Sequence, residues 1–203
     1  MIASLIYNTP ELIEPLKSQI AGIHLIDVSD EPLDGCSQRY DTNLLWSQNW
    51  HRFLSEYSKG YVWMLNSDVN GLSIEMYEDL LTMMDSNTFM VTPSFNSPHA
   101  IFNQDKLMTI DQVNWIDMCC PLINVELYHK LGGFDPELKG YFADVDLCYR
   151  ARNAGYKMYV NHNYNVHHLG SYTVNKTNKF EQAAIQDNDL IIKKYNKNWY
   201  ELI

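Results

Sequence analysis

Short apolar runs alternate along the chain with segments in which apolar residues recur at helical spacing. The apolar runs predict strands over residues 2–7, 23–28, 61–65, 89–91 and 156–160, the fourth of them ended by Pro93. Helical spacing and end signals predict helices over residues 10–20, 42–58, 73–85, 125–131, 144–154 and 180–196. Strands that alternate with helices favour an α/β fold whose sheet has parallel character.

Two segments interrupt this rhythm. Residues 94–114 are polar, rich in Asn and weakly periodic, and they fit either a hairpin or a mobile loop. Residues 171–179 are typical of a flexible segment before the last helix. The N-terminal residues lack the basic start of a secretory signal and run directly into polar residues, so we interpret them as the first core strand.

Composition and charge narrow the classes of function. The chain has 203 residues, enough for one domain or one and a half, and its 46% hydrophobic content is ample for a core. The formal net charge of -10 argues against nucleic acid or anionic lipid as the main partner, because those partners select basic surfaces. No apolar stretch approaches the roughly 18 residues of a membrane span. The four cysteines form no CxxC pair, which favours reduced thiols and a cytoplasmic location.

Polar side chains follow three of the predicted strands. They are Tyr7 with Asn8, then Asp27, then Asn66-Ser67-Asp68. Ligands of open α/β sheets bind outside the carboxyl ends of the strands, so the three groups together predict a ligand site. Taken singly, Asp27 is more often a turn former, and Asn66-Ser67-Asp68 fits a helix-capping loop equally well.

Two carboxylates begin the helix predicted over residues 144–154. Carboxylates are favoured at helix N-termini for capping alone, but residues two apart on a helix point about 200° from each other. Asp144 shares the side of Leu147 and Cys148, which we expect to pack inward, whereas Asp146 lies over Arg150 in the favourable order for a surface ion pair. We therefore take Asp144 as the candidate general base and expect Asp146 to face structure or solvent.

A histidine pair, His167-His168, follows the last predicted strand. Side chains alternate along an extended chain, so one of the two histidines is expected to point inward. A single histidine is usually a polar residue with an ordinary partner, but together with Asp68 it would form an Asp/His cation site. The imidazole makes such a site better suited to Mn²⁺ than to Ca²⁺.

In this order, the motifs resemble those of the family 2 inverting glycosyltransferases of the GT-A fold, and especially their rhamnosyltransferase-like branch. The matching segments are Asn66-Ser67-Asp68, Trp115-Ile116-Asp117-Met118, Gly132-Gly133-Phe134-Asp135, Ala143 to Arg150 with Gly155-Tyr156, and His167 to Ser171. The match runs from Leu5 to about Ser171, and the stretch from Gly132 onward is its most specific part. In its compact size the chain is also similar to the glycosyltransferase domains of large algal viruses.

The resemblance implies a GT-A fold with a central, mixed but mostly parallel sheet flanked by helices. Residues 1–171 would form the glycosyltransferase domain, and residues 172–203 would form a lid segment and a helix packed on the same domain. The implied reaction moves a sugar from a UDP- or dTDP-sugar to a hydroxyl of a glycan or glycoprotein with inversion, using Mn²⁺ or Mg²⁺. Neither a nucleic acid partner nor a membrane span is implied.

The resemblance also assigns roles to individual residues. On the donor side, Tyr7 would stack on the nucleotide base and Asp27 would hydrogen-bond it, and the other donor-side residues would be Asn8, Asn66, Ser67 and Lys176. Asp68 and His167 would hold the metal ion, and Asp144 would deprotonate the acceptor hydroxyl. The acceptor side would be lined by Trp115 and Asp117.

The chain departs from the family pattern at two positions. Ala143 stands where the family has a Glu beside the base, and Asn66 replaces the first Asp of the D-x-D motif. If both changes disabled the site, the chain would be a non-catalytic homologue that binds nucleotide or glycan. A retaining GT-A transferase is a second alternative, because it also carries a metal-binding Asp and a His.

Overall fold

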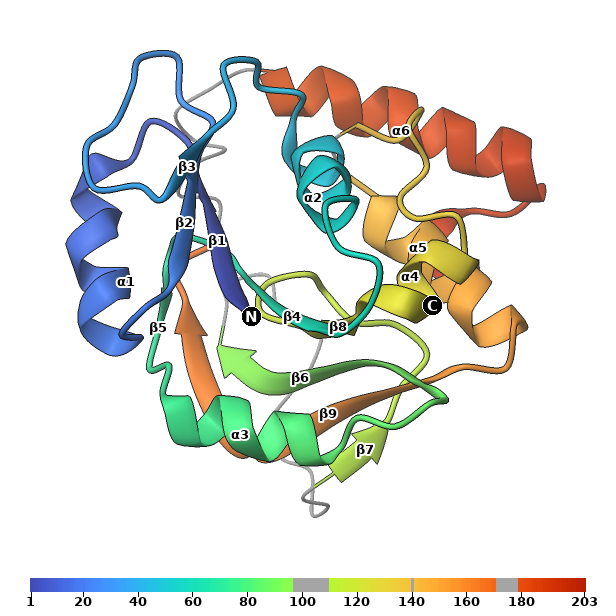
Figure 1. The fold of residues 1–203 in the computed structure, drawn as a ribbon. Helices are drawn as coiled ribbons and strands as arrows, with labels where there is room; N and C mark the ends of the chain where they lie inside the picture. The colour runs from blue at the N-terminus through green and yellow to red at the C-terminus, as the bar shows by residue number, and fades with distance from the viewer. Residues whose placement is uncertain (97–109, 140, 171–178) are drawn as a thin grey trace.

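Helices cover both faces of a central β-sheet (Figure 1). The structure, a computed structural model, describes residues 1–96, 110–139, 141–170 and 179–203. Within these ranges the strands form one nine-stranded sheet in the order β3-β2-β1-β4-β8-β6-β9-β5, with β7 paired to β9 beside this path. The strands are β1 Ile2–Ile6, β2 His24–Asp27, β3 Gln38–Arg39, β4 Tyr61–Leu65, β5 Val69–Asn70, β6 Thr88–Asn96, β7 Ile110–Gln112, β8 Leu122–Asn124 and β9 Lys157–His168.

Most of the described strands share one direction. β1 pairs in parallel with β2 and β4, and β2 pairs in parallel with β3. β8 is antiparallel to both β4 and β6, which gives β6 the direction of β4, and β9 is parallel to β6. β5 and β7 run opposite to β9. The sheet is therefore mixed but mostly parallel, which confirms the fold class expected from the sequence.

The shared direction brings the carboxyl ends of six strands to one edge of the sheet. Tyr7 follows β1 and Asn66 follows β4 at this edge, and His168 ends β9 there. Because β8 runs the opposite way, the residues that precede it, 115–121, also lie at this edge. A backbone hydrogen bond of 2.8 Å from the Asn66 N–H to the Cys119 carbonyl joins the two loops.

The helices divide between the two faces of the sheet. They are η1 Pro10–Leu12, α1 Ile13–Gln19, α2 Trp46–Leu54, α3 Ile74–Thr82, α4 Val125–Lys130, α5 Ala143–Asn153, α6 Lys179–Tyr195 and η3 Trp199–Glu201. α1 and α3 pack on one face in an apolar cluster that includes Trp63 and Leu65 of β4. α2, α4, α5 and α6 pack on the other face with Val62 and Met64. The helices therefore cover both faces of β4, which explains why its residues are apolar without interruption.

Local chemistry sets several helix ends. The side chains of Ser73 and Asn124 cap α3 and α4 by accepting the backbone N–H three residues on, over 3.1 and 3.2 Å. α2 begins at Trp46, later than the sequence prediction, because Leu45 before it has a left-handed backbone with φ 72°. Gly155, with φ 83°, follows the end of α5, as predicted for a terminating glycine.

Two strands extend beyond the sequence prediction. β6 continues through Pro93, which was expected to end it. Pro93 pairs with Asn161 of β9 and Ser94 with Asn165, so the register breaks there and residues 162–164 are passed over. Proline lacks the N–H that a regular ladder needs, and a register break removes that requirement. β9 likewise continues to His168 instead of ending at residue 160.

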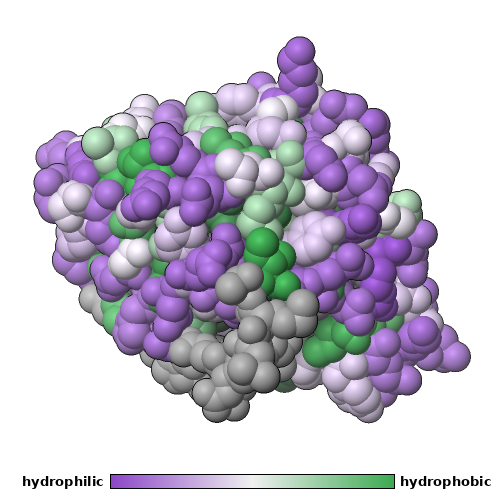
Figure 2. Space-filling model, turned by 90° about the horizontal axis from the view of Figure 1, so that it is seen from below, coloured by the Kyte–Doolittle hydropathy of each residue, from purple (hydrophilic) through white to green (hydrophobic). Residues whose placement is uncertain are grey.

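Polar residues dominate the described part of the face shown in Figure 2, with apolar residues in separate groups, in keeping with the acidic composition. Across the residues that the structure describes, no helix combines the length and apolar character that crossing a membrane requires. All four cysteines, Cys36, Cys119, Cys120 and Cys148, are free thiols.

Candidate functional site at the carboxyl edge of the sheet

Asn66, Asp68 and His168 meet at the carboxyl edge of the sheet. Nε2 of His168 lies 3.1 Å from Oδ1 of Asp68 and 3.3 Å from Nδ2 of Asn66. The Trp46 indole N–H donates to Oδ1 of Asn66 over 3.2 Å, and the Leu169 N–H donates to the Asp68 carbonyl over 3.1 Å. The side chains of Asp68 and His168 are only 7% and 12% exposed. The loop after β4 and the end of β9 are therefore fixed to each other through these side chains.

His168, not His167, faces Asp68. The family motif assigned the metal-ligand role to His167, whose side chain is exposed in the structure. His168 lies on the same face of β9 as Val166, which is 1% exposed and packs with Trp63 and Leu65, whereas Met158 packs in the cluster on the other face of the sheet. The register break at residues 162–164 interrupts the alternation along β9. Alternation from Val166 onward selects His168 once the strand is extended through residue 168.

Charges around His168 favour its protonated form. Burial lowers the pKa of His168, but the hydrogen bond to Asp68 and the charges of Asp68 and Asp117 outweigh burial and raise it above its ordinary value. Nδ1 of His168 is buried without a hydrogen-bond partner. A metal ion at Nε2 would have to displace the imidazole proton, so proton and metal compete for this nitrogen.

The Asp68–His168 pair fits a metal ion whose remaining ligands come from elsewhere. Among the residues that the structure describes, no three His, Cys, Asp or Glu side chains converge as a metal group. A cation that binds phosphate oxygens and water needs only one or two protein ligands. One carboxylate and one imidazole are a donor set suited to Mn²⁺. The pair is therefore compatible with a cation bound jointly by protein and a diphosphate.

Trp115 binds the carboxylate at the start of α5. Its indole Nε1–H donates to Oδ2 of Asp144 over 2.9 Å. Burial of the carboxyl, followed by the charge of Asp117, raises the pKa of Asp144 to about 7, against the opposing hydrogen bonds from Val145 and Trp115. A carboxyl that titrates near neutral pH is well matched to accepting a proton at that pH.

The charge of Asp117 acts on both parts of the site. It contributes to raising the pKa of His168 and that of Asp144. Asp117 belongs to the loop before β8, two residues from Trp115. Asp117 lies two residues after Trp115, whose indole binds Asp144, and two residues before Cys119, whose carbonyl accepts the Asn66 N–H. The Asp144 carboxyl and the loop that carries Asn66 and Asp68 therefore both adjoin the segment of residues 115–119.

Tyr7 and Asn8 meet the loop that follows β2. The Asn8 Nδ2–H donates to Oδ2 of Asp30 over 2.7 Å, and the Asp30 N–H donates to Oδ1 of Asn8 over 3.1 Å. The Tyr7 hydroxyl lies 3.4 Å from the same Asp30 oxygen. Burial and the charge of Asp30 raise the pKa of Tyr7. Asp30, which the sequence prediction did not select, is thus the residue that joins the ends of β1 and β2.

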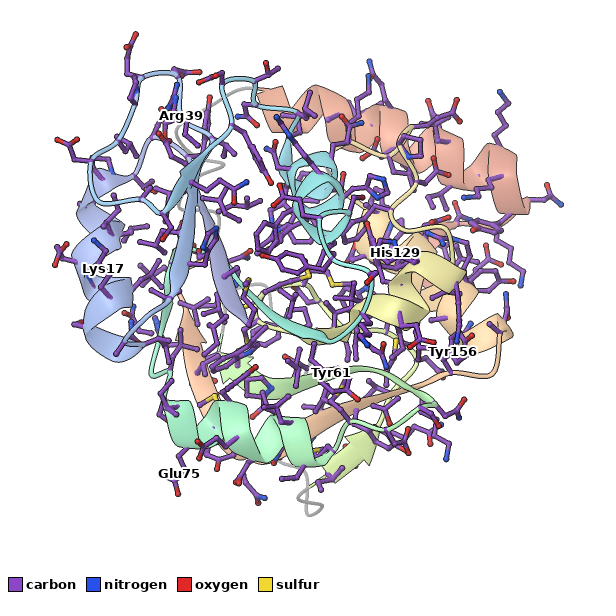
Figure 3. All side chains as sticks on the ribbon, viewed as in Figure 1. Lys17, Arg39, Tyr61, Glu75, His129 and Tyr156 are labelled. Atoms are coloured by element: carbon purple, nitrogen blue, oxygen red, sulfur yellow. The ribbon has the colours of Figure 1, made fainter. Side chains whose placement is uncertain are left out.

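Asp27 ends β2 as predicted, but its carboxylate is buried and paired. It is 1% exposed, and it accepts hydrogen bonds from the Ser29 and Leu33 backbone N–H groups, each over 2.9 Å. Arg39, which lies at this edge of the sheet in Figure 3, adds an ion pair of 2.5 Å. Burial acts to raise the pKa of Asp27, but the Leu33, Ser29 and Arg39 hydrogen bonds hold it below its ordinary value. Its partners are therefore internal ones that order the loop carrying Asp30.

Asp146 is fully buried, which corrects the expectation of a surface pair. The predicted contact with Arg150 is present at 2.6 Å, but Asp146 is 0% exposed. Lys194 and the Tyr195 hydroxyl of α6 also bind its Oδ1, each at 2.6 Å. Arg150 in turn donates to the Gly133 carbonyl over 2.7 Å. The helical pattern of α5 alone could not reveal that α6 covers this side.

Of the two remaining donor-side residues, the structure describes Ser67 but not Lys176. Ser67, between the two metal-motif side chains, is 7% exposed. Lys176 lies outside the residues that the structure describes.

The fold has relatives among solved structures. No protein-family model matches the chain, and no curated protein matches it. The crystal structure of GalNAc-T7 with UDP, GalNAc and Mn²⁺ is similar with a TM-score of 0.64 and 13% identity, over 83% of this chain and 43% of that one. The crystal structure of S. aureus TarS 1-349 is similar with a TM-score of 0.58 and 12% identity, over 91% of this chain and 64% of that one.

Both structures have the GT-A fold, so the chain has a GT-A fold as well. At this level of identity the likeness concerns the fold. The chain spans less than two thirds of the length of either protein.

Proposed function

We propose that this chain is a metal-dependent glycosyltransferase. It would transfer a sugar from a UDP- or dTDP-sugar to a hydroxyl of a glycan or glycoprotein acceptor, with inversion at the anomeric carbon. The observation that carries the proposal is that Asp144, bound by Trp115, and the loop of the Asp68–His168 pair both adjoin residues 115–119 at the carboxyl edge of a GT-A sheet. The UDP and Mn²⁺ named with the GalNAc-T7 structure support the same substrate class and metal.

In this proposal Asp68 and His168 hold the metal ion. When bound, Mn²⁺ or Mg²⁺ supplies Lewis-acid stabilisation of the charge on the departing diphosphate. The formal net charge of -10 supports a need for the cation, because an acidic chain would otherwise repel a polyanionic donor.

Asp144 accepts the proton of the acceptor hydroxyl. As this oxygen bonds to the anomeric carbon, the bond from that carbon to the diphosphate oxygen breaks, and the nucleoside diphosphate leaves with the electron pair. Attack on the face opposite the leaving group inverts the configuration. The Trp115 indole N–H, 2.9 Å from the carboxylate, orients the base, and Trp115 and Asp117 line the acceptor side.

On the donor side, Tyr7 stacks on the nucleotide base, next to the Asn8–Asp30 contact. Asp27 acts differently from the direct base contact that the family resemblance implied. Its carboxylate is 1% exposed and already holds Arg39 at 2.5 Å, so it orders the loop that places Asp30. Asn66, whose Oδ1 accepts the Trp46 indole N–H, lies beside His168 on the donor side.

The first test is binding. A thermal-shift panel of nucleotide sugars, each with and without Mn²⁺, should give the largest rise in melting temperature for one UDP- or dTDP-sugar with the metal present, because binding stabilises the folded state by mass action. The Asp68→Ala variant should lose the metal-dependent part of the shift. Asp34→Asn, at an exposed position, is the matched control.

The second test is turnover with the donor that binds. Sugar transfer or donor hydrolysis by the wild type, and its loss in Asp144→Asn, is the expected result. Binding of nucleotide without turnover for any acceptor would instead identify a non-catalytic homologue. NMR of the product's anomeric configuration separates inversion from retention.

A further inference from the structure

Asp187 of α6 holds the backbone that leads into α5. Its Oδ1 accepts the Lys139 N–H over 3.1 Å, and its Oδ2 accepts the Tyr141 N–H over 2.9 Å. Asp187 is 1% exposed, although it lies on a helix whose next acidic residue, Asp189, is exposed. A buried carboxylate is costly unless its oxygens are satisfied, so these two hydrogen bonds fix both the side chain and the loop.

The segment held by Asp187 ends directly before the proposed base. Phe142, between Tyr141 and the first residue of α5, has a left-handed backbone with φ 62°. A left-handed bulky residue is unfavourable and persists only where its surroundings enforce it. The Phe142 carbonyl accepts the Asp146 N–H over 2.9 Å, which closes the first turn around Asp144. The orientation of the Asp144 side chain in the first turn of α5 therefore depends on the conformation of the preceding residues, Tyr141 and Phe142.

A second set of contacts prevents α6 from sliding on α5. Lys194 and Tyr195, two turns beyond Asp187, bind the buried Asp146 carboxylate at 2.6 Å. Ile191 between them is 0% exposed in the cluster that also contains Leu147 of α5. The C-terminal part of α6 is thus fixed on α5. Asp187 of the same helix binds the Lys139 and Tyr141 N–H groups, so the loop before α5 is held in place relative to α6.

We propose that Asp187 is a positioning residue for Asp144: it holds the segment around Tyr141 so that the Asp144 carboxyl stays beside Trp115 in the orientation that catalysis needs. The role of Asp144 as a base rests on the proposed function. The position of its carboxyl beside Trp115 is observed in the structure and does not depend on that function. Asp187 touches neither substrate nor base. It acts through the loop backbone.

The test uses Asp187→Asn in the full chain, with Asp189→Asn as the matched control on the same helix. An amide of the same shape offers one acceptor oxygen and puts an N–H₂ group against one of the two backbone donors, so one hydrogen bond is lost. We expect kcat to fall by roughly 10²-fold, the effect of about 1 Å of misplacement, while the donor KM stays near its wild-type value. Asp189→Asn should leave both constants unchanged.

A readout that needs no turnover separates this inference from the proposed function. The Asp144 carboxyl can be titrated by carbon-detected NMR, with assignment from Asp144→Asn. The charge that faces it is that of Asp117, while burial raises the pKa of the nearby Cys148 thiol and keeps it neutral. In folded Asp187→Asn, a shifted Asp144 titration and faster amide exchange at Tyr141 and Asp146 support positioning, even if the wild type transfers no sugar. An unchanged titration together with unchanged kcat overturns it.

Amide exchange in the wild type serves if Asp187→Asn does not fold. The Lys139 and Tyr141 amides should then be as strongly protected from hydrogen exchange as the Leu147 amide inside α5, because each donates a hydrogen bond to the buried Asp187 carboxylate. Exchange at the rate of an open loop would overturn the inference.

Discussion

The indole N–H of Trp115 donates to the Asp144 carboxylate over 2.9 Å, joining the loop before β8 to the first turn of α5. The first segment precedes α4 in the sequence and the second follows it. Because β8 runs antiparallel to its neighbours, the loop before it lies at the carboxyl edge of the sheet, where it meets the start of α5. The contact orients the carboxyl proposed as the base and lowers its pKa, against the burial and the Asp117 charge that raise it.

Trp115→Phe should weaken catalysis by changing the proton affinity of Asp144. The indole hydrogen bond favours the charged carboxylate, so its loss should raise the pKa of Asp144 further above about 7. A hydrogen bond to a charged group contributes about 1.5–3 kcal/mol, so kcat/KM at neutral pH should fall roughly 10- to 100-fold. The acid limb of the pH profile should also move to higher pH. An unchanged profile would contradict the proposed role of the indole.

Asp144 should make folding stability depend on pH. Its pKa is about 7 in the folded chain against an ordinary 3.8, so the folded state binds more protons than the unfolded state between these values. Stability contributed by the protonated group is therefore full below about pH 4 and is lost as pH rises towards 7, by at most about 1.4 kcal/mol per pH unit.

Urea unfolding of the wild type and Asp144→Asn across this range checks the prediction. The variant lacks the titration, so its stability should gain on that of the wild type as pH rises from about 4 to 7, and then stay level. Parallel stability curves for the two proteins would show that Asp144 titrates normally.

The Asp146 network should matter for stability more than any exposed ion pair. Asp146 is 0% exposed and binds Arg150 and Lys194, each at 2.6 Å. Asp146→Asn would leave Arg150 without its carboxylate and Lys194 with Asp135 alone. Breaking a buried pair costs about 3–5 kcal/mol of unfolding free energy. Lys130→Ala is the control, because its pair with Glu126 is over half exposed on both sides and should contribute less than about 1 kcal/mol.

His168 and His167 should differ in metal binding although they are adjacent. His168→Ala removes the nitrogen beside Asp68 and should weaken Mn²⁺ affinity at least tenfold, measured by calorimetry with the nucleotide present. His167→Ala, at an exposed position, should change it little. The reverse order would restore the ligand assignment taken from the family motif.

Mn²⁺ affinity should also increase with pH. Asp68 and Asp117 raise the pKa of His168 above its ordinary value, so metal must displace a proton that is held more tightly than usual. Affinity should therefore rise as pH passes through this raised pKa and level off above it. Calorimetry in buffers of different ionisation enthalpy should detect about one proton released per metal ion.

Patterns confined to one segment predicted much of the fold. The apolar run of β4 and the start and end signals of α5 lie within a few residues, and the structure has both elements within one residue of the expected bounds. The predicted end of β6 at Pro93 was wrong, because a strand can continue through proline where its register with a neighbouring strand breaks. That break is a relation between β6 and β9, and the β6 segment alone does not show it.

The site was predicted to the same degree. Asp68 and Asp144 were selected because each begins or ends a recognisable element, and their roles stay predictions. His168 was not selected because motif order was preferred to the alternation from Val166 to His168, which follows a register break that depends on pairing with β6. The burial of Asp146 and the contacts of Asp187 arise where α6 packs on segments more than forty residues away, a separation across which periodicity carries no information.

The measurement that tests the central proposal most directly is Mn²⁺-dependent sugar transfer from the best-binding nucleotide sugar by the wild type and Asp144→Asn. The proposal predicts turnover by the wild type, loss of at least 10²-fold in the variant, and unchanged donor binding by both. Equal turnover by a folded Asp144→Asn protein would contradict it.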